Sequence, residues 1–228
     1  MIFVTGDTHG NPDRFSSKAI GDIQRGDYLI VCGDFGFVWD GGRREERLLR
    51  MLSKQRFYIL FIDGCHENYD RLYQYPVTEW NGGKVRFIRP NVVHLLRGQV
   101  FEIEGNTIFT MGGGVSPDID LRSQRGTKWW AEETPSTEEM VEAVDNLYKY
   151  DLTVDYIVTH ECPTKVKELV CNELTCFNAA TAFFDELSVQ VKYKHWFFGS
   201  VHKDRHLSSA HTALFNNIVP LEVPRKSW

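Results

Sequence analysis

The sequence has no apolar run long enough to cross a membrane. No stretch of its 228 residues approaches the ~18 unbroken apolar residues that a membrane helix needs. The opening MIFVTGDTHG turns polar after five residues and has no basic leader followed by an apolar core, so we predict no secretion signal. We therefore expect a cytoplasmic protein with no membrane partner.

The sequence also lacks excess positive charge and an even set of cysteines. A net charge of −5 argues against broad binding to duplex nucleic acid or anionic membrane, which both need clustered Lys and Arg, although a local basic site remains possible. Five cysteines, without an export signal, favour reduced thiols over a disulfide framework.

Repeats, linkers and low-complexity segments are absent as well. The chain is 42% hydrophobic and 13% aromatic, and its 228 residues are enough to bury one substantial core but few for two independent cores. We expect a single domain over residues 1–228.

The first hundred residues alternate between two periodicities. Apolar runs at 1–5, 28–32 and 57–62 predict strands, and apolar residues at helical spacing predict helices within 12–24 and 43–54. Strand-helix-strand units are typical of a parallel sheet with both faces covered.

The remainder of the chain mixes short strands with helices. Four short runs within 84–111 predict a meander, and the capping box of Ser136 and Glu139 begins a helix within 135–150. Further strands are predicted at 155–159, 195–199 and 211–222, and a helix near 178–187. These patterns predict a central sheet sandwiched by helices.

Acidic or imidazole side chains follow five of the predicted strands. They are Asp7 and His9, Asp34, His66 and Glu67, His160 with Glu161, and His202. The carboxyl ends of strands in an open α/β sheet meet at one edge, so these side chains should converge. A lone Asp there is usually a cap and a lone His a core residue. Five groups together instead suit Mn, Fe or Zn, and two such ions can clamp a phosphoryl group.

The ordered blocks GDTHG, GDFG, GCHEN, a lone histidine and GSVH resemble the motifs of the calcineurin-like metallophosphoesterases. That family carries D-x-H, G-D, G-N-H-[DE], a lone His and G-H-x-H. The resemblance runs from Asp7 to His202 and implies an α/β fold, the four-layered α/β/β/α sandwich of the metallophosphoesterase type. GDFGFVWD lacks the arginine motif of the protein serine/threonine phosphatases, so a small prokaryotic or phage-type phosphoesterase is the nearer relative.

The resemblance also implies metal ligands. It assigns a first metal to Asp7, His9, the bridging Asp34 and His202, which are all present. The second metal would take Asp34, His160 and the positions held here by Cys65 and Ser200. The family has asparagine at the position of Cys65 and histidine at that of Ser200.

Both departures therefore fall on the second metal. A thiolate can bind Zn or Fe, whereas serine is a poorer ligand than imidazole. We expect one or two divalent ions (Mn, Fe or Zn), with the first site complete and the second altered.

The resemblance implies a metal-dependent phosphoric ester hydrolase. It would cleave a phosphomonoester or phosphodiester through metal-bound hydroxide, with His66 as the general acid for the leaving alcohol. The expected partner is a phosphate ester, and nucleic acid is expected only as a substrate. The alternative is a degenerate, non-catalytic member that binds metal or a phosphate-containing ligand as a sensor or assembly subunit, which the two altered ligands favour.

Two further interpretations concern Cys65 and the segment 121–130. A nucleophilic Cys65 paired with His66 is disfavoured, because adjacent side chains in an extended segment tend to point apart. Arg122 and Arg125 could hold a second phosphate, while Trp129 and Trp130 could stack a base or simply pack the segment onto the core.

Overall fold

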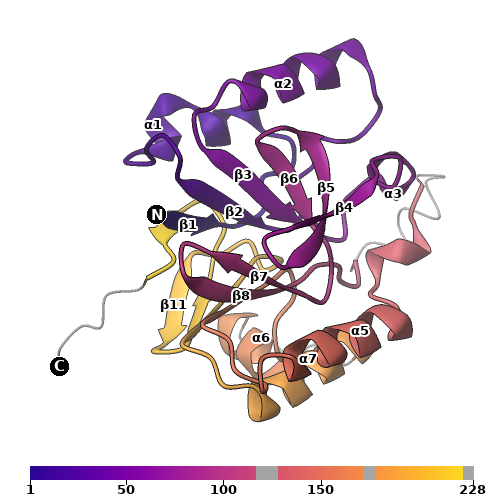
Figure 1. Cartoon of the computed structure of the whole chain (residues 1–228), viewed down its shortest axis with the longest axis vertical. Coiled ribbons are helices and arrows are strands. Elements are labelled where there is room, and N and C mark those ends of the chain that lie inside the picture. Colours follow the sequence, from indigo (N-terminus) through magenta and orange to yellow (C-terminus); the bar gives the residue numbers. More distant parts are fainter. Residues whose placement is uncertain (117–127, 172–177, 223–228) are drawn as a thin grey trace.

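The protein consists of two β-sheets packed face to face between two layers of helices (Figure 1). The computed structural model describes residues 1–116, 128–171 and 178–222. This mixed α/β architecture confirms the four-layered metallophosphoesterase fold. Among the described residues, no helix is both long and apolar enough to span a bilayer.

The first sheet has seven strands in the order β13-β1-β2-β3-β6-β5-β4. Its parallel centre pairs β1 with β2, β2 with β3 and β3 with β6, and the outer strands are antiparallel. The strands are β1 (Ile2–Thr5), β2 (Tyr28–Cys32), β3 (Tyr58–Ile62), β4 (Val77–Trp80), β5 (Gly83–Arg89), β6 (Val92–Leu95) and β13 (Ile218–Pro220).

The second sheet has six strands in the order β11-β12-β10-β9-β8-β7. Its four central strands are parallel, and β7 and β11 close the two edges in antiparallel pairs. The strands are β7 (Gln99–Ile103), β8 (Asn106–Met111), β9 (Tyr156–Thr159), β10 (His195–Phe198), β11 (Arg205–Ser208) and β12 (His211–Ala213).

The helices cover the outer faces of both sheets. They are η1 (Pro12–Phe15), α1 (Ser17–Ile20), α2 (Arg43–Ser53), α3 (Tyr69–Leu72), η2 (Ala131–Glu133), α5 (Thr137–Tyr148), α6 (Thr164–Cys171) and α7 (Ala179–Gln190). Leu49 and Leu52 of α2 are buried against the first sheet, and Ala143 and Leu147 of α5 against the second. The capping box of Ser136 and Glu139 forms as predicted.

A third apolar cluster lies between the sheets. It joins Ile30 and Leu60 of the first sheet to Val158 and Phe197 of the second, each fully buried. Burial of apolar surface on both faces explains why the central strands are nearly continuous apolar runs. This shared apolar cluster packs the two sheets together and so fixes the ends of their strands relative to one another.

The predictions of one central sheet and a single meander were wrong. The chain leaves the first sheet after β6 and enters the second at β7, so the four runs within 84–111 form two separate antiparallel pairs. The run at 211–222 divides in the same way, because β12 belongs to the second sheet and β13 to the first. β4, β11 and α6 were not predicted.

Candidate metal centre

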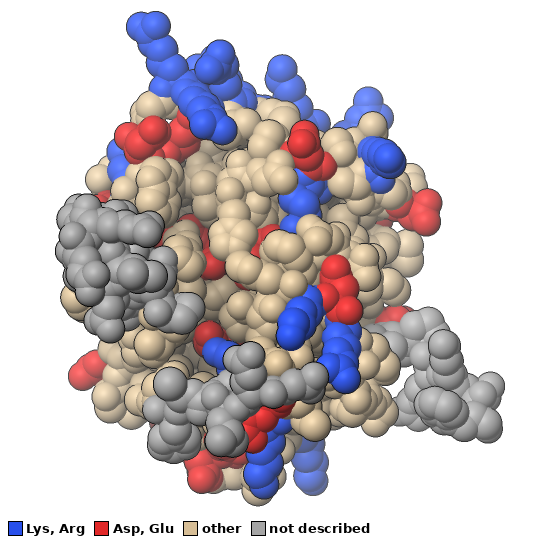
Figure 2. Space-filling view, turned by 180° about the vertical axis from the view of Figure 1, so that it is seen from behind, with Lys and Arg blue, Asp and Glu red and all other residues tan. Residues whose placement is uncertain are grey.

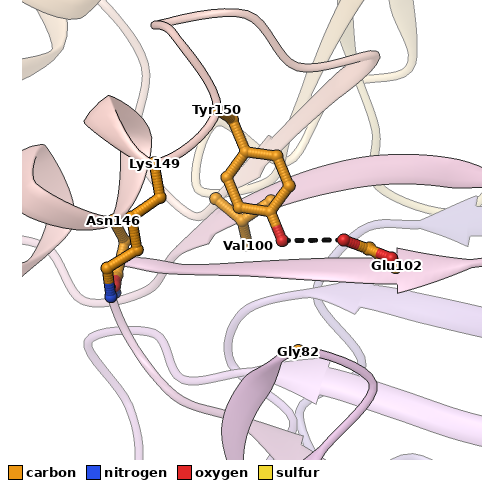
Figure 3. A pocket seen from close by; sticks show the side chains of 6 residues that line it. All are labelled: Gly82, Val100, Glu102, Asn146, Lys149 and Tyr150. Carbon is orange, nitrogen blue, oxygen red and sulfur yellow. Dashed lines mark hydrogen bonds between the residues drawn. The ribbon is translucent and has the colours of Figure 1, made fainter.

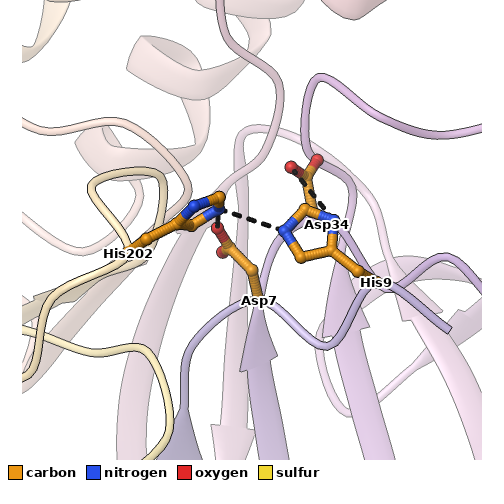
Figure 4. A group of neighbouring side chains, drawn as sticks. All are labelled: Asp7, His9, Asp34 and His202. Carbon is orange, nitrogen blue, oxygen red and sulfur yellow. Dashed lines mark hydrogen bonds and ion pairs between the residues drawn. The ribbon is translucent and has the colours of Figure 1, made fainter. Parts of the chain in front are cut away.

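The functional side chains meet where parallel strands of both sheets end. Asp7 follows β1, Asp34 follows β2, and His202 follows β10. With His9 they form a group whose ligand atoms all lie within 4.8 Å of one another. Figure 4 shows these four side chains pointing toward one another, Asp7 and His9 from the loop after β1 and the other two from the loops after β2 and β10. The predicted first-site residues are therefore brought together.

The contacts within this group are close. Nε2 of His202 lies 3.0 Å from Oδ2 of Asp7 and 3.0 Å from Nε2 of His9. Nδ1 of His9 lies 3.9 Å from Oδ2 of Asp34. The carboxylates are buried, Asp7 at 1% and Asp34 at 2% exposure, whereas both imidazoles reach solvent. The group is thus open on one side.

Neighbouring imidazoles keep the two carboxylates ionised. Burial alone would raise the pKa of Asp34, but His160 and hydrogen bonds from His66 hold that pKa well below its usual range. The pKa of Asp7 is also lowered, against the effect of burial, by His160 and His202. Burial lowers the pKa of His9, which favours its neutral form. Neutral imidazole and ionised carboxylate are the forms that bind metal.

The donor set fits a divalent cation. A neutral imidazole has one N–H and one lone pair, so each ring can turn the lone pair of Nε2 toward the space that the two rings share with a carboxylate oxygen of Asp7. Carboxylate oxygen with imidazole nitrogen suits Mn, Fe or Zn. Asp7, His9, Asp34 and His202 can therefore hold one such ion.

A second group shares Asp34 with the first. It comprises Asp34, Cys65 and His66. Sγ of Cys65 lies 3.9 Å from Oδ2 of Asp34, and Nδ1 of His66 lies 3.0 Å from the same oxygen. Nε2 of His160 lies 3.6 Å from the sulfur and 3.8 Å from Oδ1 of Asp34. Asp34 therefore contacts both groups.

The orientation of His160 is set by a main-chain carbonyl. Its Nδ1 lies 3.0 Å from the oxygen of Cys32, and an Nδ1–H donated to that carbonyl directs Nε2 toward Cys65 and Asp34. His160 is fully buried, and the carboxylates of Asp34 and Asp7 raise its pKa well above the usual value although burial opposes them.

The expectation that Cys65 and His66 point apart was wrong. Sγ of Cys65 lies 3.4 Å from Nδ1 of His66, because the chain bends at these two residues instead of continuing as a strand. Hydrogen bonds with Asp34 and Cys65 raise the pKa of His66 to about 11.

Ser200 stands at the remaining second-site position. Its Oγ is buried and has no hydrogen-bond partner among the described residues. Its backbone N–H points to Oδ1 of Asp7 at 3.4 Å. A buried hydroxyl without a partner is unusual and marks a place where an additional group would be stabilised.

The backbone of the site is strained. Of the eight described non-glycine residues with positive φ, four are site residues: His9 at 47°, Asp34 at 42°, Ser200 at 52° and His202 at 49°. Such conformations cost about 1–3 kcal/mol each and cluster at functional sites. Gly64 is required for close approach, since a Cβ there would lie 2.1 Å from Oδ1 of Asp34.

Two supporting residues, Glu67 and Arg14, were assigned no role from the sequence. The buried Glu67 accepts the N–H of Phe35 at 2.6 Å and of Gly36 at 3.3 Å, which ties the third loop to the second. Nη1 of Arg14 donates to the carbonyl of Asp7 at 2.8 Å. Glu67 belongs to the GCHEN block, so its position was visible, but its partners depend on the fold.

Other predicted residues lie elsewhere. Arg122 and Arg125 fall outside the described residues. Trp130 is buried, as the packing interpretation expected, whereas Trp129 is 44% exposed. A hollow of about 300 Å³, in which Tyr150 donates to Glu102 at 3.0 Å, is lined by none of the predicted site residues (Figure 3).

Comparisons with known proteins were made for the whole chain. The family described as calcineurin-like phosphoesterase matches residues 1–204. No curated protein matches the chain. Among solved structures, the chain is similar to the crystal structure of phosphopantetheinyl hydrolase (PptH) from Mycobacterium tuberculosis, with 14% identity and a TM-score of 0.46 over 94% of this chain and 89% of that one.

Proposed function

Because this chain belongs to the calcineurin-like phosphoesterase family, we propose that it is a metal-dependent hydrolase of phosphomonoesters or phosphodiesters. The observation that supports this most is the convergence of Asp7, His9, Asp34 and His202 into one ligand group. Their loops come from both sheets, which also supports our proposal that residues 1–228 form one domain.

Two ions would share Asp34. The first would be held by Asp7, His9, Asp34 and His202, and the second by Asp34, Cys65 and His160. When bound, such ions supply Lewis acidity and make hydroxide available near neutral pH. Mn, Fe and Zn all suit the first group, and the thiol of Cys65 favours Zn or Fe in the second.

His66 is the proposed general acid. Its ring is 35% exposed and is held by Asp34 at 3.0 Å, so it can reach a substrate while remaining oriented. Its hydrogen bonds with Asp34 and Cys65 raise its pKa, which favours the protonated ring in the metal-free protein. Protonation of the leaving oxygen is the step that an alcohol, as a poor leaving group, requires.

A second candidate function is metal or phosphate binding without turnover. The Oγ of Ser200, buried and without a partner in the part of the chain that the structure describes, favours it, because this position supplies only a short hydroxyl to the second ion. Metal content and turnover therefore have to be measured on the same sample.

The test compares the wild type with Asp34→Ala. Metal content is measured by mass spectrometry, and hydrolysis of p-nitrophenyl phosphate and bis(p-nitrophenyl) phosphate is followed with added Mn, Fe or Zn. The variant should lose metal and activity together, since Asp34 contacts both groups. Asp145→Ala, an exposed carboxylate on α5, is the control and should lose neither.

The outcomes separate the two functions. Metal bound by the wild type without hydrolysis of either ester would favour the binding function. Unchanged metal content and hydrolysis in Asp34→Ala would refute the assignment of the site.

A further inference from the structure

Helix α2 presents a basic face to solvent. Arg43, Arg47, Arg50 and the following Lys54 recur at helical spacing, and all four are exposed. Three of them border a shallow hollow of about 690 Å³, together with Gly41, Gly42 and Glu46. Figure 2 shows Lys and Arg side chains projecting from the upper end of the molecule, where Figure 1 places α2.

Most of this positive charge is uncompensated. Glu46, the acidic residue of the hollow, is paired with Arg50 at 3.0 Å and Arg89 at 2.5 Å. Arg43 and Arg47 have no ion pair with any described residue. The chain as a whole carries a net charge of −5, so an anionic partner would be attracted to this positive face rather than to the rest of the surface.

The basic face is linked to the metal centre by a short, rigid turn. The buried carboxylate of Glu45 accepts the N–H groups of Trp39, Asp40 and Gly41 at 2.7, 2.7 and 2.8 Å. The amide of Asn68 donates to the carbonyl of Trp39, which ties the turn to the loop that carries His66. The turn is thus fixed both to α2 and to the loop that carries His66.

An exposed tryptophan occupies this turn. Trp39 is 44% exposed and meets the buried Trp130 edge to face, with ring centroids 6.1 Å apart. Lys128 lies 4.9 Å from the Trp130 ring. An exposed aromatic ring in the segment that joins a candidate phosphoester centre to a helix with a row of arginines suits single-stranded nucleic acid, in which bases stack and phosphates pair with cations.

Other anionic partners fit less well. The bases of a duplex are already stacked, so the exposed face of Trp39 would contribute little to binding one. A membrane surface would attract the arginines but would not require a phosphate-ester hydrolase centre in the same chain.

We propose that Trp39 and the arginine face of α2 bind single-stranded nucleic acid, so that a polynucleotide phosphodiester is the substrate class of the metal centre. The assignment as substrate rests on the proposed hydrolase function. In the reaction, water forms one new P–O bond, the ester P–O bond breaks, and the leaving sugar oxygen takes a proton.

Binding is tested without turnover, by fluorescence anisotropy of a labelled oligothymidylate of about 20 nucleotides in the presence of a chelator. The affinity of the wild type should fall steeply between about 50 and 200 mM salt. R43E/R47E should weaken binding at least about tenfold and reduce the slope of log K against log salt by about 1.4, since each lost phosphate contact removes about 0.7.

The role of Trp39 is tested by W39A and W39F. Loss of base stacking should weaken binding about 5- to 100-fold in W39A, and W39F, which keeps an aromatic ring, should recover most of it. The matched control is K149E/K192E, which makes the same charge change at exposed lysines of the other helical layer and should bind within about twofold of the wild type. Circular dichroism confirms that each variant is folded.

Three results would overturn the inference. These are equal losses in R43E/R47E and the control, no loss in W39A, and binding of a matched duplex or of phosphatidylserine vesicles in preference to the single strand. If the wild type hydrolyses bis(p-nitrophenyl) phosphate but neither binds nor cleaves the oligonucleotide, this inference is refuted and the hydrolase function is retained. Trp39-dependent binding without hydrolysis of the oligonucleotide or of either nitrophenyl ester would retain the binding face and refute the hydrolase function.

Discussion

Asp63 anchors the loop that carries Cys65 and His66. It follows β3 and is 1% exposed. Its carboxylate accepts hydrogen bonds from Nε and Nη2 of Arg97, the nearer at 2.5 Å, and from the Tyr69 hydroxyl at 3.0 Å, and Nε2 of His94 lies 3.0 Å away. Arg97 is itself 6% exposed, so the two charges form a buried ion pair.

Asp63→Asn removes the charge and preserves the shape. Breaking a buried pair by removing one partner typically costs about 3–5 kcal/mol, because the other charge stays buried without compensation. Glu139, 2.9 Å from Arg97, remains as a partner but is one-third exposed, so we expect the lower half of that range. The loss is a large fraction of the about 5–15 kcal/mol that stabilises a typical domain.

Urea unfolding followed by circular dichroism gives the free energy of unfolding for comparison. The control is Glu142→Gln, which breaks the pair of Lys84 and Glu142 at 2.6 Å, where both side chains are about 40% exposed. Solvent screening should limit that loss to less than about 1 kcal/mol. The two variants remove the same charge at sites that differ in burial.

The pH dependence provides an independent check. Arg97 and His94 hold the pKa of Asp63 well below its usual range, although burial opposes them. The unfolded chain takes up this proton near pH 4, so the stabilisation is present above about pH 4 and is lost as the pH falls toward the folded-state pKa. The difference between wild type and Asp63→Asn should therefore narrow in acid. A difference below about 1 kcal/mol at pH 7 would refute the reasoning.

Three further predictions concern substitutions of one or two side chains. His66→Ala should lower kcat/KM by about 10²–10⁴-fold for an alkyl phosphate and much less for a nitrophenyl ester, and equal losses would contradict its role as general acid. Ser200→His should raise second-metal content, Cys65→Asn should shift preference from Zn toward Mn, and the double variant should exceed either single one. Metal titration followed by mass spectrometry checks this, and a double variant without a second ion would contradict it. Burial lowers the pKa of His195 to about 4, so its contribution to stability is present above about pH 6.5 and is lost as the pH falls toward 4. Both proteins should lose free energy of unfolding when the pH falls from 7.5 to 5. After a discount for solvent screening, the loss in His195→Gln should be about 1 kcal/mol smaller than the loss in the wild type. Urea unfolding at both pH values measures the two losses.

Buried strands could be predicted from the sequence because they are continuous runs of apolar residues. β2 was predicted with its observed bounds, and β3 within one residue. β4 and β11 are mostly exposed and polar, so they carry no such run. Which sheet a strand joins was not predictable, since β6 and β7 look alike in sequence and differ only in their partners.

The motif order identified which side chains should gather, and the structure brings Asp7, His9, Asp34 and His202 together. It did not reveal the bend that turns Cys65 onto His66 or the carbonyl that orients His160. Those contacts depend on backbone conformation and on residues up to 128 positions apart. Local periodicity carries no information of that kind.

The candidate ligands come from both ends of the chain and from both sheets. Asp7 and Asp34 follow strands of the first sheet, whereas His160 and His202 follow strands of the second. A nascent chain emerges with its N-terminal half first and at that stage carries only part of the site. The first ligand group is therefore complete only after His202 has been synthesised and the two sheets have docked. A bound ion would then connect ligands from both sheets, and its binding free energy would oppose separation of the first sheet from the second.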